Sequence, residues 1–90
     1  MSRHDPDLQK AFDANRRAKA LAAIPETAIR NFENMSIGER RWAHLQAEMQ
    51  AMRHDKLAAT DEALGRDSGY NRGCAANRRA TADALKAVGL

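Results

Sequence analysis

The sequence predicts an all-α protein, a small helical bundle of three to four helices that is completed by oligomerisation. Apolar residues recur at three- and four-residue spacing along most of the chain, residues that start and stop helices separate these stretches, and no stretch alternates as a strand would. A chain of 90 residues corresponds to a single all-helical domain over 1–90. We expect its helices at about 6–24, 26–35, 37–64 and 70–88.

Prolines delimit the first two helices. Asp5 can cap the first helix, and Pro6 suits its first position because the N–H that proline lacks would be unpaired there anyway. Pro25 ends this helix near Ile24, since its ring blocks the helical hydrogen bond and restricts the residue before it. The second helix, over 26–35, restarts the pattern directly after this proline.

The third helix has the clearest start. Ser36 and Glu39 have the spacing of a capping box, in which each side chain binds a backbone N–H of the first turn. The helix is expected to end at Gly65 with a left-handed cap. A break at Thr60 is an alternative, because Thr60 precedes two acidic residues and itself resembles a helix start. The last helix ends at Gly89.

The apolar core is thin. Hydrophobic residues make up 43% of the chain, but 19 of the 90 residues are alanine, so few side chains can bury a large area. Small chains without disulfides or metals often complete their cores by associating. We therefore expect a homo-oligomer. The single cysteine, Cys74, excludes an internal disulfide framework, and no apolar run is long enough for a membrane span, so we expect a cytoplasmic protein and no membrane partner.

A stripe of large apolar residues runs along the third helix at helical spacing. Its members are Trp42, Leu45, Met49 and Met52. In a chain with so few large side chains, the favoured interpretation is that the stripe forms the core of the subunit or of a dimer. The alternative is a docking surface for another protein, because methionine adapts to irregular partners.

A short repeat links the two ends of the chain. Ala14–Ala20 (ANRRAKA) recurs as Ala76–Ala82 (ANRRATA), and both copies place an asparagine, Asn15 or Asn77, among apolar neighbours at helical spacing. A polar residue in a helix seam fixes register or oligomer state, and we assign that role to both asparagines. Chance similarity in an Ala- and Arg-rich sequence is the alternative explanation of the repeat.

Positive charge is concentrated in the same two segments. The net charge is +3, and arginine outnumbers lysine eleven to four. The candidate contacts to phosphate or to an acidic partner are Arg16, Arg17, Arg72, Arg78 and Arg79. A solvated helix surface with ordinary charge pairs is the alternative, and it is favoured because the net charge is modest.

Residues 61–79 have some features of a helix-turn-helix, with Gly69 at the turn and Asn71 placed to reach bases. At the positions that normally hold two branched apolar residues, however, the chain has Ala75 and Arg78. A plain turn between two helices is therefore the favoured interpretation.

The sequence predicts no catalytic, cofactor or metal site. His44 and Glu48 are one helical turn apart, but His54 lies on another side of the helix, and Cys74 has no paired cysteine and no nearby histidine. The glycines at 65, 69 and 73 lack the lysine and hydroxyl residue of a nucleotide loop. We therefore expect a protein that is not an enzyme.

The function expected by elimination is that of a small non-enzymatic helical binding protein. It would inhibit or regulate another macromolecule by occupying its surface, as small proteins of phages and mobile elements do. The alternative is a DNA-binding regulator that uses a degenerate helix-turn-helix at 61–79 and the terminal arginines, which would make nucleic acid the partner.

Overall fold

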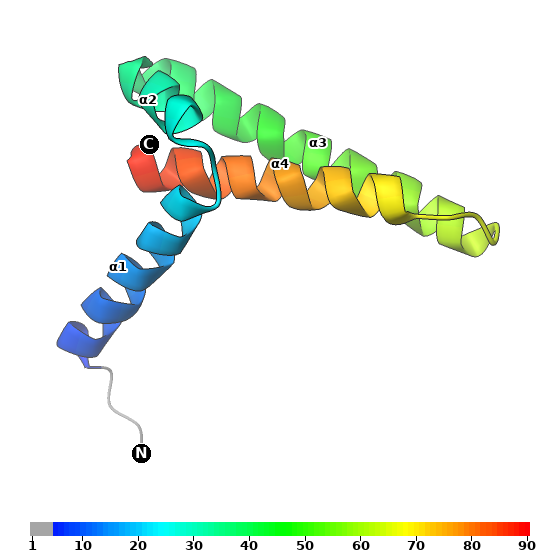
Figure 1. Cartoon of the computed structure of the whole chain (residues 1–90), viewed down its shortest axis with the longest axis horizontal. Helices are drawn as coiled ribbons and strands as arrows, with labels where there is room; N and C mark the ends of the chain where they lie inside the picture. The colour runs from blue at the N-terminus through cyan, green and yellow to red at the C-terminus, as the bar shows by residue number, and fades with distance from the viewer. Residues whose placement is uncertain (1–4) are drawn as a thin grey trace.

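Four helices form the structure, a computed structural model that describes residues 5–90. They are α1 (Pro6–Ala22), α2 (Glu26–Asn34), α3 (Ile37–Ala63) and α4 (Gly69–Val88). Helices α3 and α4 lie side by side as a long antiparallel hairpin, α1 and α2 contact α4, and the N-terminal part of α1 projects away from the hairpin (Figure 1). The prediction of an all-α fold is confirmed, with no strand among residues 5–90. The first four residues of the predicted domain 1–90 lie outside the described range.

Local sequence determines where the helices begin. The carboxylate of Asp5 accepts hydrogen bonds from the N–H groups of Asp7 and Leu8 at 2.9 and 3.3 Å. Ser36 and Glu39 form both bonds of the predicted capping box, at 3.1 and 3.0 Å. The bond that the Ser36 N–H donates to the Glu39 carboxylate lowers the pKa of Glu39. Helix α1 ends at Ala22, two residues before the predicted end.

The end of α3 is a Schellman motif. Gly65 has φ 71°, its N–H donates to the carbonyl of Glu62 at 3.1 Å, and the N–H of Arg66 donates to the carbonyl of Asp61 at 2.7 Å. The predicted left-handed cap is confirmed. The alternative break at Thr60 does not occur, because its hydroxyl donates to the carbonyl of Lys56 inside the continuous helix.

Small residues fill the contact between α3 and α4. The alanine seam consists of Ala47, Ala51 and Ala58 on α3 with Ala75, Ala82 and Leu85 on α4, and each of these residues is 5% exposed or less. Ala51 and Ala58 are seven positions apart, as are Ala75 and Ala82, which is the repeat of helices that pack nearly in line. Side chains at the contact set the distance between two helices, so alanine lets α3 and α4 approach closely.

Arg40 joins the ends of three helices. Its guanidinium donates to the carbonyls of Phe32 and Met35 at the end of α2, at 3.2 and 2.7 Å, and to the carbonyl of Gly89 after α4, at 2.8 Å. The last carbonyls of a helix lack intrahelical partners and carry partial negative charge. One cation on α3 therefore satisfies the C-terminal ends of both α2 and α4.

The alanine seam leaves no room for larger side chains. Ala58 is 0% exposed, whereas its neighbour Ala59 is exposed. We expect Ala58→Leu to lower the free energy of unfolding by about 1–3 kcal/mol, because the added atoms force the two helices apart. Ala59→Leu is the matched control and should change it by less than about 0.5 kcal/mol. Urea unfolding followed by circular dichroism measures both, and equal effects would contradict the tight seam.

Candidate interaction surface on helix α3

The stripe of Trp42, Leu45, Met49 and Met52 lies on the side of α3 that faces away from α4. Trp42 precedes the seam residue Ala51 by nine positions, which at 100° per residue places the two on opposite sides of the helix. The four side chains are 64, 47, 56 and 59% exposed, respectively. The stripe therefore does not form the core of the subunit, because alanines occupy the contact with α4. Whether it forms the core of a dimer stays a prediction.

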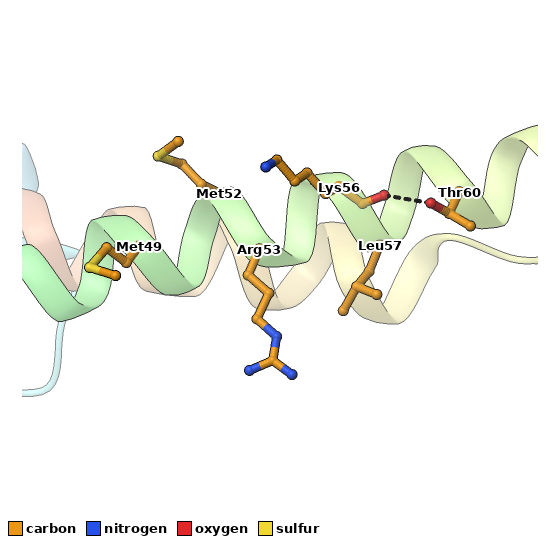
Figure 2. Close-up of a pocket in the computed structure, with 6 residues that line it drawn as sticks. All are labelled: Met49, Met52, Arg53, Lys56, Leu57 and Thr60. Carbon is orange, nitrogen blue, oxygen red and sulfur yellow. Dashed lines mark hydrogen bonds between the residues drawn. The ribbon is translucent and has the colours of Figure 1, made fainter.

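A shallow groove of about 380 Å³ continues the stripe toward the end of α3. It is lined by Met49, Met52, Arg53, Lys56, Leu57 and Thr60. Figure 2 shows Arg53 and Leu57 extending from one side of α3, and Met52 and Lys56 from the other. Neither Arg53 nor Lys56 forms an ion pair with any residue between 5 and 90. We call the stripe and this groove together the outer face.

The opposite side of α3 is held to α4 by polar contacts. The amide of Asn71 donates to the carboxylate of Asp61 at 2.8 Å, and its carbonyl oxygen lies 2.9 Å from Nδ1 of His54. Both ends of this amide are thus used within the hairpin. Asn71, which the helix-turn-helix hypothesis placed against DNA bases, instead bridges two residues that lie two turns apart on the same side of α3.

Two of the five arginines assigned to phosphate pair with carboxylates of α3. Arg72 donates to Glu62 at 2.8 and 3.0 Å and lies 3.5 Å from Asp55, and Arg79 donates to Asp55 through both terminal nitrogens. Hydrogen bonding to Arg79 lowers the pKa of Asp55, and hydrogen bonding to Arg72 lowers that of Glu62. These two arginines therefore stabilise the hairpin, a role that the local sequence did not reveal because each partner is 10 or more residues away.

The other three arginines are exposed and take no part in these pairs. Arg16, Arg17 and Arg78 form no ion pair among the described residues. Arg17 lines a hollow between the four helices together with Glu33 of α2 and Arg40 of α3. The structure thus separates the five arginines that the sequence grouped together.

Asn15 and Asn77 are both exposed, so neither lies in a seam between helices of this chain. The reason is that α3 makes the most extensive contact with α4, and it does so through the face that carries Ala75 and Ala82. Within the subunit neither asparagine is buried against a neighbouring helix. A role of these asparagines between copies stays a prediction.

The geometry of a helix-turn-helix is not formed over 61–79. The two helices of that motif cross at a wide angle. Here α3 and α4 run antiparallel along their length, with contacts from the Arg72–Glu62 pair near the turn to the Arg40–Gly89 bond at the far end (Figure 1). The favoured alternative, a turn between two packed helices, is the one observed.

Chemically reactive groups are scattered over the described part of the chain. His44 lies 3.4 Å from Glu48, but among residues 5–90 no three His, Cys, Asp or Glu side chains gather as metal ligands would. Cys74 is partly buried, and its thiol one helical turn from Tyr70 raises the pKa of the Tyr70 phenol. We therefore take the outer face as the candidate functional site.

Comparisons with known proteins add no relative. No protein-family model matches the chain, and neither curated proteins nor solved structures give a match. Within residues 5–90, no helix combines the length and apolar character needed to cross a membrane. Function must therefore be inferred from the surface of the molecule itself.

The ion pairs between α3 and α4 predict acid sensitivity. Because folding lowers the pKa of Asp55 and Glu62, their contribution is present above the ordinary carboxyl pKa, near 4, and is lost as pH falls through the lowered values. We expect the midpoint of thermal unfolding to fall between pH 7 and pH 3, and Asp55→Asn to reduce both the midpoint at pH 7 and its dependence on pH.

Asp83→Asn is the control for this prediction, because Asp83 is exposed and forms no ion pair among the described residues. Circular dichroism melts at several pH values provide the measurement. If the pH profile of Asp55→Asn matches those of the parent and of Asp83→Asn, the ion pairs between α3 and α4 add nothing to stability.

Proposed function

We propose that this protein is a small non-enzymatic binding protein that inhibits or regulates another macromolecule by occupying its surface with the outer face of α3. One observation supports this most directly: the largest apolar side chains of the longest helix point away from the rest of the subunit and are about half exposed or more. Contiguous exposed apolar surface is characteristic of interaction sites. Trp42 is well suited as an anchor, because tryptophan is enriched among residues that dominate binding energy.

The chemistry of the outer face specifies the kind of partner. Met49 and Met52 provide a deformable apolar surface, while Arg53 and Lys56 border it with positive charge that has no counterion among residues 5–90. A complementary partner is a protein helix with apolar anchors and carboxylates beside them. Such a helix buries the stripe and neutralises the two cations in one contact.

DNA binding remains the alternative function, with less support. Two of its five arginines, Arg72 and Arg79, are paired with α3 carboxylates, and Asn71 is bound within the hairpin. What favours it is that Arg16, Arg17 and Arg78 are exposed and without ion pairs among the described residues. Three unpaired cations make a weaker phosphate surface than the five that the sequence suggested.

Site-specific photocrosslinking tests the binding function. A photoreactive residue at position 49 should crosslink a protein in the producing cells, whereas the same residue at exposed Asp83 of α4 should not. Trp42→Ala should reduce the crosslink at position 49 by roughly tenfold or more, which corresponds to about 1.4 kcal/mol or more of binding energy. Arg53→Glu with Lys56→Glu should reduce it further while leaving helicity unchanged. Crosslinking that is unchanged by all these substitutions would argue against the outer face as the binding site.

Retention on duplex DNA tests the alternative. If DNA is the partner, retention should fall steeply with rising salt, and replacing Arg16, Arg17 and Arg78 with glutamine should abolish it. Replacing Arg72 and Arg79 instead should mainly reduce stability, since these side chains hold the hairpin. We expect no retention even at low salt, and salt-dependent retention by the folded protein would favour the alternative.

A further inference from the structure

The outer face is complementary to itself. It carries apolar residues at its centre, cations toward the end of α3, and an aromatic ring and a carboxylate near the start of α3. A surface that is self-complementary about a two-fold axis is the requirement for a symmetric dimer. We propose that the helix that occupies the outer face is α3 of a second copy of this chain, packed antiparallel with Leu45 of one copy opposite Met52 of the other. This inference rests on the proposed function of the outer face and names its occupant.

The antiparallel direction follows from charge. In a parallel pair each residue lies near its own counterpart, so Arg53 would meet Arg53 and Lys56 would meet Lys56, and these cations repel each other. In the antiparallel pair the Arg53–Lys56 segment of one copy lies beside Trp42 and the first turns of the other. An arginine or lysine over a tryptophan ring is attracted by its π electrons.

The same register supplies a carboxylate. Glu39 lies in the first turn of α3, three residues before Trp42, and the bonds of the capping box hold the pKa of Glu39 below its ordinary value. Glu39 is thus a fixed anion at neutral pH. It lies at the edge of the outer face, in the region that Lys56 of the second copy approaches. One register therefore provides an apolar partner for the stripe and places Arg53 and Lys56 near Trp42 and Glu39. Arg41, which this register sets opposite Lys56, is already bound within its own subunit, because its guanidinium donates to the carbonyl of Leu90 at 3.2 and 3.0 Å.

The rest of the subunit leaves this approach open. Helices α1 and α2 contact α4, and α3 packs on α4 through the alanine seam (Figure 1). With 27 residues, α3 is about 40 Å long, so the two helices can overlap along the whole stripe and groove. A typical stable interface buries roughly 800 Å² on each partner. A contact between two single helices lies at the small end of this range, so we expect a reversible dimer that depends on concentration.

The oligomeric state provides the first test. Light scattering should show the mass rising from monomer to dimer with concentration, and Met49→Glu should weaken dimerisation at least tenfold. Ala76→Glu is the matched control: it adds the same charge at an exposed position of α4, outside the outer face. Trp42 is the only tryptophan, so its emission should shift to the blue and its quenching by acrylamide should fall as the dimer forms.

Cysteine crosslinking tests the direction. In a Cys74→Ser background with unchanged helicity, Met49→Cys lies beside the two-fold axis and should form a disulfide with its own counterpart. Leu45→Cys and Met52→Cys each lie about 10 Å along the axis from their own counterparts, too far for a disulfide, but should crosslink with each other when the two variants are mixed. Efficient crosslinking of Leu45→Cys alone would show a parallel pair and overturn the proposal.

The outcomes separate this inference from the proposed function. A mass that stays at the monomer value across the soluble range, with Trp42 fully quenchable, overturns the dimer. Photocrosslinking at position 49 to a different protein, sensitive to Trp42→Ala, would then leave the binding function standing. Absence of both the dimer and the crosslink overturns both. A dimer that Met49→Glu and Ala76→Glu weaken equally overturns the placement of its interface on the outer face.

Discussion

The structure depends on the small size of the residues between α3 and α4. Ala47, Ala51 and Ala58 of α3 and the alanines that face them on α4 allow the two helices to pack closely. Among residues 5–90, Leu85 is the only large side chain that is completely buried. A face made of alanine contributes little hydrophobic area, so it needs specific polar contacts to select one register. Because the alanines of α3 pack against α4, the opposite side of α3, with its larger apolar residues, lies on the surface.

Polar contacts between the helices add to the packing of the alanine seam. The Asn71 amide is fixed between His54 and Asp61, arginines of α4 pair with carboxylates of α3, and Arg40 satisfies carbonyl groups at the ends of α2 and α4. These contacts are distributed along the hairpin from its turn to its open end. They use basic residues that would otherwise be available for nucleic acid, which is why charge alone is a poor guide to function here.

The outer face combines two properties that are unusual together in an isolated subunit. It exposes tryptophan, leucine and methionine side chains, and it carries cations for which residues 5–90 provide no anion. Both properties favour the same kind of occupant, a helix that has apolar residues and carboxylates. The helix α3 itself meets this description when it is reversed, so one sequence can supply both sides of the contact.

The sequence by itself determined the helices and most of their boundaries, because proline, the capping box of Ser36 and Glu39, and the left-handed Gly65 act on neighbouring backbone groups. It also contained the stripe on α3. Only the tertiary structure decided which face of α3 meets α4, since an alanine face and a face with larger residues are both apolar at helical spacing. Likewise, Arg72 and Arg79 find their partners across the hairpin, and such contacts depend on which helices become neighbours.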